Sequence, residues 1–321
     1  MRKQLVVLSG LLAVLPAVLP AQAVPPWSGG RNDPVADRGV VFQVDDIDNV
    51  PDLHGDPSDA GLVLLIGGNQ FMVLPELVQA FVREHPDLRD RIFYETLPPG
   101  ILARQIAAHG TLTLGNLTLH LHPDVYEAGL NKLQAMASTH SVRDVTAYAT
   151  NDLAIMVAAG NPKHIQGLAD LGRADVRLSM PNPAWEGVAH QIETALRQAG
   201  GEELVTMVMT TKVRSGATLL THIHHRETAM RILQGRSDAG VTWQSEVRFQ
   251  QHIGNPIMGV AIPARQNTTG TYAAEVLSQA PHAAAAEAWV HFLQSPAAQA
   301  IYQAHGFGIP DKTGGGAVTH R

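Results

Sequence analysis

The residues best suited to bind a ligand lie in short polar loops that directly follow apolar runs. Residues 67–70 follow the apolar run Leu62–Ile66, and residues 96–100 follow a second run at 91–95. In α/β proteins, ligands bind where parallel strands end, and glycines there let the backbone approach closely. An ordinary tight turn is the alternative for either loop. From these loops we expect ligand contacts from Gly68, Asn69, Gln70, Thr96 and Gly100.

A second set of polar loop residues lies later in the chain. The sequence Trp-Glu-Gly at 185–187 precedes a helical pattern at 188–199, and the sequence Gln-Ser-Glu at 244–246 follows an apolar run that ends at Trp243. An indole donates one hydrogen bond or stacks on a ligand, although either tryptophan could instead lie in a core. The ligand contacts that we expect here are Glu186, Gly187, Trp243, Gln244 and Ser245.

Three acidic residues, Glu95, Glu186 and Glu246, fall in or beside these loops. Carboxylates around a dianion are unfavourable unless they point away or are neutralised. They would suit a cationic, metal-bearing or hydroxyl-rich ligand, or they are solvated loop acids. The acids therefore leave the charge of the ligand open.

The chain holds 16 histidines. His120 and His122 alternate as on one face of a strand, and the histidines within 222–226 fall in a segment, 218–235, that we predict as a helix. A transition-metal site needs three or four converging ligands, and the sequence has no strict metal-binding spacing. We therefore expect no bound metal and no cofactor. Residues 222–226 could instead present donors to an anion.

Composition and motifs argue against two classes of protein. The formal net charge is −6 at pH 7, so the sequence lacks a basic nucleic-acid footprint. It contains none of the GxSxG, SxxK, Walker or GxGxxG motifs, and we expect a binding protein rather than an enzyme. Paired carboxylates such as Glu186 and Glu246 leave acid–base chemistry as the alternative.

Residues 1–23 are typical of a cleavable secretory signal peptide. Arg2 and Lys3 precede the apolar run 5–19, and the sequence Ala-Gln-Ala at 21–23 fits a cleavage site. The run is shorter than the ~20 residues that a membrane span needs, so a retained anchor is the weaker alternative. The chain has no cysteine, hence no disulfide and no lipid-attachment site, and we expect a free periplasmic protein.

Apolar runs alternate with helical patterns along the rest of the chain. Strands are predicted at 62–66, 91–95, 177–180 and 239–243, and helices at 101–108, 188–199 and 218–235, with another helix opening at 123–124. Residues 145–158 are predicted as two short strands or one bent strand. Residues 256–263 are predicted as the strand that returns to the first half of the chain. Such alternation indicates a largely parallel sheet.

The C-terminal segment and four motifs follow an order that is found in one protein family. Segment 283–310 has an Ala-rich helix, a Ser-Pro pair and a closing Gly-Phe-Gly-Ile-Pro sequence. The motifs are the loop at 67–70, Leu-Ala-Arg-Gln-Ile at 102–106, Leu-Ala-Asp-Leu at 168–171 and Gly-Arg-Ser-Asp-Ala-Gly-Val-Thr-Trp at 235–243. Together they resemble molybdate-binding proteins and related type II periplasmic solute-binding proteins of ABC importers.

The resemblance implies an α/β fold of two lobes, each a largely parallel sheet flanked by helices, with a ligand cleft between them. Behind the signal peptide at 1–23 we expect an N-terminal extension at 24–59, lobe one at 60–147 plus 262–321, and lobe two at 148–261. We assign no role to the extension. Crossover strands near 145–150 and 256–263 would act as hinges.

The function that the resemblance implies is capture of a small polar solute, an oxyanion such as molybdate or tungstate first, by a monomer that delivers it to an ABC permease. The sequence departs from the family pattern at Pro98 and Pro99, which lack N–H groups, and at Trp243, near the place of an aromatic hydroxyl. A metal-bearing or polar organic solute is the alternative. A second alternative is a periplasmic sensor that passes a ligand signal to a membrane receptor.

Overall fold

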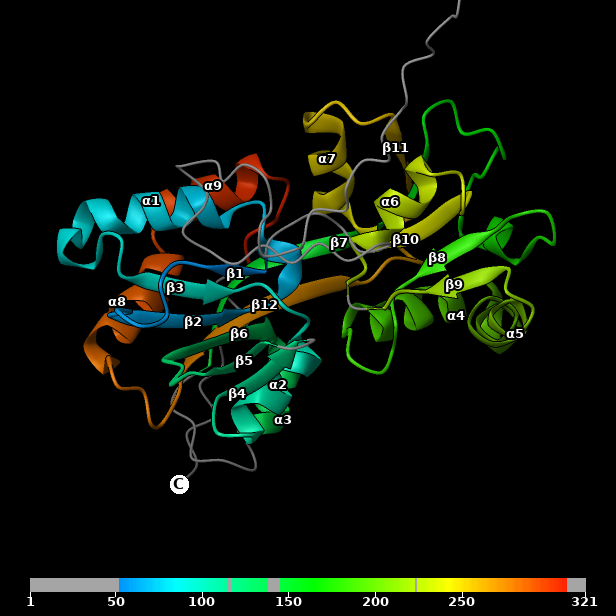
Figure 1. The fold of residues 1–321 in the computed structure, drawn as a ribbon. Helices are drawn as coiled ribbons and strands as arrows, with labels where there is room; N and C mark the ends of the chain where they lie inside the picture. Colours follow the sequence, from blue (N-terminus) through cyan, green and yellow to red (C-terminus); the bar gives the residue numbers. More distant parts are fainter. Residues whose placement is uncertain (1–51, 115–116, 138–144, 223, 311–321) are drawn as a thin grey trace, which may run out of the picture.

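The computed structural model describes residues 52–114, 117–137, 145–222 and 224–310. The predicted signal peptide, most of the extension and residues 311–321 lie outside this range. Figure 1 shows two groups of strands and helices joined by long strands through the middle of the molecule. We call these groups lobe one and lobe two, as the resemblance implies. Their residue boundaries stay a prediction.

Lobe one is built on the N-terminal strands. They lie in the order β1-β3-β2-β6, and β2 pairs in parallel with both β3 and β6. All residues of β2 are buried, which accounts for the continuous apolar sequence of this strand. A separate hairpin of β4 and β5 lies outside this sheet. The strands are β1 (Leu53–His54), β2 (Leu62–Ile66), β3 (Ile92–Glu95), β4 (Thr111–Leu114), β5 (Leu117–His120) and β6 (Val125–Gly129).

Lobe two repeats this arrangement with fewer strands. Strand β8 pairs in parallel with β10 on one side and with β9 on the other. Strand β11 lies beside the crossover strand β7. The strands are β8 (Leu178–Met180), β9 (Thr218–Leu220), β10 (Ala239–Trp243) and β11 (Ile257–Ala261).

Two long antiparallel strands join the lobes, β7 (Thr146–Ala158) and β12 (Thr269–Val276). The first half of β7 pairs with β12 and the second half pairs with β10 and β11. Of the two predictions for 145–158, a single strand is confirmed, and it spans Thr146–Ala158. The predicted return at 256–263 is wrong, because this segment alternates as an edge strand against β7, and β12 crosses back to pair with β6.

Helices cover both faces of each half of the sheet (Figure 1). In lobe one, α1, α8 and α9 pack on one face and α2 and α3 on the other. In lobe two, α4 packs on one face, and α6 and α7 on the other. Within the described residues, no helix has the length and apolar character that a membrane span requires. The helices are α1 (Leu74–Glu84), α2 (Pro99–Ala107), α3 (Leu130–Ala137), α4 (Val188–Thr206), α5 (Lys212–Arg214), α6 (Glu227–Leu233), α7 (Gln244–His252), α8 (Ala283–Leu293) and α9 (Pro296–Ala304).

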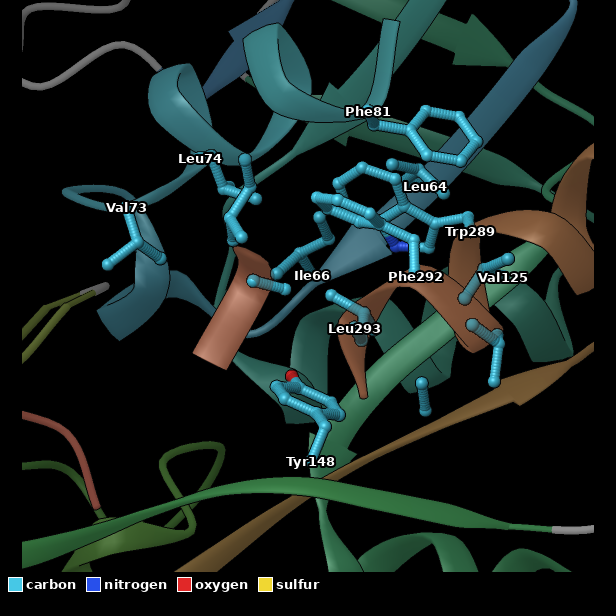
Figure 2. Close-up of a cluster of buried hydrophobic side chains, with 14 of the residues drawn as sticks. Leu64, Ile66, Val73, Leu74, Phe81, Val125, Tyr148, Trp289, Phe292 and Leu293 are labelled. Atoms are coloured by element: carbon cyan, nitrogen blue, oxygen red, sulfur yellow. The ribbon is translucent and has the colours of Figure 1, made fainter. Parts of the chain in front are cut away.

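The core of lobe one joins segments from both ends of the chain (Figure 2). Phe81 of α1 packs edge-on against Trp289 of α8, with ring centroids 5.1 Å apart. Leu64 and Ile66 of β2 lie in the same cluster and are fully buried. Burying each such side chain stabilises the fold by about 1.5–3 kcal/mol. The loop after β2 is therefore held on a rigid support.

One predicted helix start is a strand instead. We predict a helix opening at 123–124, but β6 follows directly and α3 begins at Leu130. The carboxylate of Asp124 accepts hydrogen bonds from the N–H groups of Val63 and His282, at 2.8 and 2.7 Å. An aspartate that commonly caps a helix thus binds two neighbouring segments here.

The helix predicted at 218–235 is also wrong over its first half. Residues Thr218–Leu220 form β9, which pairs with β8, and the helical part begins only at Glu227. Tertiary pairing overrides the local helical spacing. The histidines of 222–226 therefore lie in a loop at a strand end. The helix predicted at 188–199 continues through a kink at Gly200 and Gly201.

Candidate ligand-binding site

The two lobes touch where the loops after their parallel strands face each other, and we call this contact the seam. The N–H of Gly100, at the start of α2, donates to the carbonyl oxygen of Trp185, before α4, at 3.1 Å. A Cβ at Gly100 would lie 2.7 Å from that oxygen. Only glycine therefore allows lobe one to approach lobe two this closely.

A buried ion pair crosses the seam. The guanidinium of Arg226 donates from Nη2 to Oδ1 of Asp52 at 2.6 Å and to the carbonyl oxygen of Thr96 at 3.3 Å. His224 Nε2 lies 3.0 Å from Oδ2 of Asp52, and the hydroxyl of Thr96 donates to Oδ1 at 3.2 Å. Burial opposes ionisation, but attraction to His224 and Arg226 outweighs it and lowers the pKa of Asp52 to about 2.

A second charged cluster lies beside the first, within lobe two. Nδ1 of His225 is 2.5 Å from Glu186, and its Nε2 is 2.7 Å from Glu246. Burial would lower the pKa of this imidazole, but Glu246 and Glu186 raise it to about 10. Burial would also raise the pKa of Glu186, yet His225 and the hydroxyl of Thr221 lower it. His225 is therefore a cation at neutral pH.

Little space remains between these groups. A cavity of about 10 Å³ is lined in part by Phe71, His225, Arg226 and Glu246. The guanidinium carbon of Arg226 lies 4.7 Å above the ring centroid of Phe71, a cation–π contact. Such a volume holds about one water molecule. This cavity therefore has no room for a solute larger than water.

Polar residues of the crossover strands connect the two sides of the seam. The amide of Asn69 donates to the hydroxyl of Tyr272 on β12. The amide of Asn151 on β7 donates to Oγ of Ser245 at 2.7 Å and to the Tyr272 hydroxyl at 3.5 Å. The loop after β2 in lobe one is thereby linked to the start of α7 in lobe two through both crossover strands.

Six of the predicted contact residues lie at the seam or bond to it. Gly68 is among them, because a Cβ there would lie 3.0 Å from the His224 ring and 2.5 Å from the Thr96 carbonyl oxygen. These residues are Gly68, Asn69, Thr96, Gly100, Glu186 and Ser245.

The other four predicted contact residues lie elsewhere. Gln70 is fully buried and accepts hydrogen bonds from two tyrosine hydroxyls of the lobe-one core. Trp243 packs on Gly270 and Tyr272 in the lobe-two core. Gln244 lines a groove of about 420 Å³ beside α7 and β11. Gly187 is exposed, and a Cβ there would meet open space among the described residues.

The sequence predictions missed several residues of the seam. Asp52 belongs to the predicted extension, and the partner that it contacts, His224, is 172 positions away. Tyr272 and Asn151 lie inside strands and not in loops. Arg226 and the neighbouring histidines were assigned as possible anion donors, but on a helix. Long-range contacts of this kind have no local sequence signal.

A metal centre is not indicated by the side chains in the described ranges. There, no group of three or more histidine and acidic side chains is arranged to hold a metal ion. His120, one of the alternating pair, bonds instead to Thr111 across the β4–β5 hairpin, at 3.1 Å. His222 is mostly exposed and lies 3.4 Å from Glu227.

The model of a known protein family matches residues 62–308, well over half of the chain, and its description is bacterial extracellular solute-binding protein. The chain belongs to this family. Two relatives among characterised proteins match part of this solute-binding protein. A sulfate-binding protein of Synechococcus elongatus is 27% identical over 161 residues, or 48% of this chain and 46% of its own. The molybdate-binding protein ModA of Mycobacterium bovis is 26% identical over 171 residues, which are 51% of this chain and 57% of ModA.

The fold agrees with a solved member of this class. The sulfate-binding protein SubI of Mycobacterium tuberculosis superposes with a TM-score of 0.65 at 18% identity, covering 78% of this chain and 87% of that one. At this identity the likeness shows the two-lobed fold alone. The solute-binding protein described here spans about half the length of the two characterised relatives that it matches.

Proposed function

We propose that this solute-binding protein acts in the periplasm, captures a small oxyanion between its lobes and passes it to an ABC permease. The observation that carries the proposal is the buried guanidinium of Arg226 at the seam, next in sequence to the protonated His225. Arg226 is paired with one carboxylate, that of Asp52, whereas His225 lies between two, so Arg226 is the cation that would bind an anion where both lobes meet. The protein binds its solute without converting it.

Each acid at the seam contacts a cation, which offsets part of the repulsion between its carboxylate and a bound anion. Asp52 faces Arg226, and Glu186 and Glu246 share His225. A buried ion pair is weak evidence for stability, since desolvation offsets much of the attraction. Arginine does, however, match the oxygen atoms of planar or tetrahedral anions well. Retention of these charges at a lobe contact therefore favours a ligand role.

Sulfate and molybdate are the first candidates. The two relatives named above are described as binding these ions, and both ions are tetrahedral dianions with four equivalent oxygens. Tungstate has the same shape and charge. The two prolines before Gly100 remove N–H groups from that loop, so the side chains of Arg226, His224 and Thr96 would supply more of the hydrogen bonds.

Capture would follow from closure of the lobes. In the described residues the sheet passes from one lobe to the other through β12, which pairs with β6, and β7, which pairs with β12, β10 and β11, so we take these two strands as the hinge. A solute shifts the protein toward the closed form only by its greater affinity for that form. Contacts from both lobes to one anion would provide this difference.

A thermal-unfolding screen of the exported protein tests the proposal. The panel holds sulfate, molybdate, tungstate, phosphate, divalent metals, small sugars, amines and organic acids. A ligand at about 1,000 times its Kd stabilises the folded state by about 4 kcal/mol. We expect saturable stabilisation by sulfate, molybdate or tungstate. Stabilisation by a metal or an organic solute, without any oxyanion effect, would replace the proposed ligand and keep the binding function.

Delivery to a permease needs its own test. Deletion of the gene should lower uptake of the identified oxyanion from micromolar medium, and expression of the chain should restore it. Normal uptake together with a lost transcriptional response to the same ion would indicate a sensor role instead.

A further inference from the structure

The carboxylate of Asp52 lies where an anionic ligand group would be expected. Its side chain is buried and faces polar groups from both lobes: the Arg226 guanidinium and the His224 imidazole of lobe two and the Thr96 hydroxyl of lobe one. The three distances are 2.6, 3.0 and 3.2 Å. A carboxylate surrounded in this way by a guanidinium, an imidazole and a hydroxyl has the surroundings of a bound anion.

This carboxylate comes from outside the part of the chain that the family model matches. Asp52 precedes β1, whereas the matched region begins at residue 62. The side chains around it, Thr96, His224 and Arg226, all lie inside that region. We call the place enclosed by these three side chains the anion seat. The seat therefore belongs to the family core, and the group that fills it belongs to the N-terminal extension.

We propose that Asp52 is a built-in competitor, which occupies the anion seat at Arg226 and must leave before the solute can bind there. The inference rests on the proposed function, since it assumes that the solute is an anion. It gives a role to the end of the extension, for which the sequence suggested none.

The segment that carries Asp52 is attached so that its side chain can leave. Strand β1 has only two residues, which pair with Glu95 and Tyr94. The backbone of Asp52 itself accepts one hydrogen bond, from the N–H of Thr96 at 2.9 Å. Rotation of the Asp52 side chain would vacate the seat and leave this backbone pairing intact.

Competition has a direct consequence for affinity. When a ligand binds only to the fraction of molecules with an empty seat, the apparent Kd rises as that fraction falls. Asp52 also links lobe one to lobe two, so it favours contact between the lobes when no solute is bound. The competitor therefore raises the solute concentration at which half of the protein molecules are loaded.

Asp52→Asn and Asp52→Ala test the proposal, with Asp56→Asn as the matched control. Asp56 is an exposed aspartate four residues after Asp52, and its carboxylate accepts hydrogen bonds from the N–H and the hydroxyl of Ser58. Sulfate and molybdate affinities are measured by calorimetry for the wild type and all three variants. We expect both Asp52 variants to bind the oxyanion at least about tenfold more tightly, and Asp56→Asn to bind as the wild type does. Unchanged or weaker affinity of the Asp52 variants would overturn the proposal.

A second measurement separates this inference from the choice of solute. Asp52→Ala leaves room for a free carboxylate, so acetate should stabilise this variant in a saturable way and leave the wild type unchanged. Acetate stabilisation of Asp52→Ala without any oxyanion binding would support an anion seat filled by Asp52 and would overturn the oxyanion function. Absence of both effects would overturn both proposals.

Discussion

Buried carboxyl groups in two regions of this molecule behave in opposite ways. At the seam, Asp52 and Glu186 lie against cationic side chains, and the pKa of each is lowered. On the α2–α3 face of the lobe-one sheet, Glu95 and Glu275 are equally buried, but burial raises the pKa of each to about 7. Neither oxygen of Glu275 has a hydrogen-bond partner within the described residues.

The difference shows what determines ionisation in a protein interior. Burial disfavours the charged form of every one of these groups, and at the seam cations in contact, with hydrogen bonds, outweigh it. The seam is therefore a place where charge is kept at a cost, whereas the lobe-one face holds carboxyls that tend toward the neutral form. We interpret the maintained charge as the feature that binds solute.

The largest expected effect comes from removing the guanidinium of Arg226 from the seam. Arg226→Met leaves Asp52 buried without its guanidinium, and loss of one partner of a buried pair costs about 3–5 kcal/mol. Oxyanion binding should be lost. Chemical denaturation and calorimetry measure the two effects. Arg83→Met, on the exposed side of α1, is the matched control and should change neither.

Destabilisation of Arg226→Met should be relieved by a second change. In Asp52→Asn/Arg226→Met both charges are gone, so the double variant should recover most of the lost stability while still failing to bind oxyanion. Equal stability of the single and double variants would contradict the paired-charge account of the seam.

Glu186→Gln removes one of the two carboxylates of His225 and should cost about 2 kcal/mol. The pKa of His225 rises on folding from 6.5 to about 10, so its stabilising contribution is complete below about pH 6.5 and is lost as pH rises through 10. The deficit in the free energy of unfolding of the variant, relative to the wild type, should therefore be largest near pH 6 and should shrink toward pH 10. Denaturation at a series of pH values measures it, together with the His225 pKa by NMR. A deficit that is constant across this range would argue against a charged His225.

Glu95→Gln should stabilise the protein at high pH, whereas Glu186→Gln should destabilise it. The pKa of Glu95 rises on folding from 4.5 to about 7, so folding stability from this group is complete below pH 4.5 and is lost as pH rises through 7. The variant keeps the oxygen that accepts from Gln105. It should match the wild type near pH 4.5 and be more stable by about 1–2 kcal/mol above pH 7. Thermal unfolding at both pH values decides this, and a destabilised variant at the higher pH would contradict the neutral-carboxyl account.

The smallest effect should come from the glycine at the lobe contact. Gly100→Ala would push the Trp185 carbonyl away and weaken oxyanion binding roughly fivefold, about 1 kcal/mol. Gly187→Ala is the matched control, because a Cβ there meets open space among the described residues. Calorimetry on both variants compares the two glycines. Equal affinities would show that the lobes need not approach this closely.

Much of the fold could be predicted from the sequence because it depends on local patterns. The buried strand β2 is a continuous apolar run, and β10 ends at the predicted Trp243. The errors fall where tertiary contacts decide the outcome. Asp124 looks like a helix cap but binds Val63 and His282, and residues 218–220 have helical spacing but pair with β8.

The candidate site was predictable only in part, and for the same reason. The loops after β2 and β3 could be located because parallel strands end at one edge of a sheet. The orientation of individual side chains within a loop could not, so Asn69 reaches the seam whereas Gln70 points into the core. The pairing of Asp52 with Arg226 joins residues 174 positions apart, and no local sequence pattern predicts it.

The central claim is that Arg226 at the seam binds an oxyanion. The most direct measurement is calorimetric titration of the purified protein without residues 1–23, with sulfate and with molybdate, beside Arg226→Lys and Arg83→Met. Lysine keeps the charge but loses the fork of donors, so we expect saturable binding by the wild type and by Arg83→Met, and at least about tenfold weaker binding by Arg226→Lys. Oxyanion binding of equal strength in all three proteins, or in none of them, would contradict the claim.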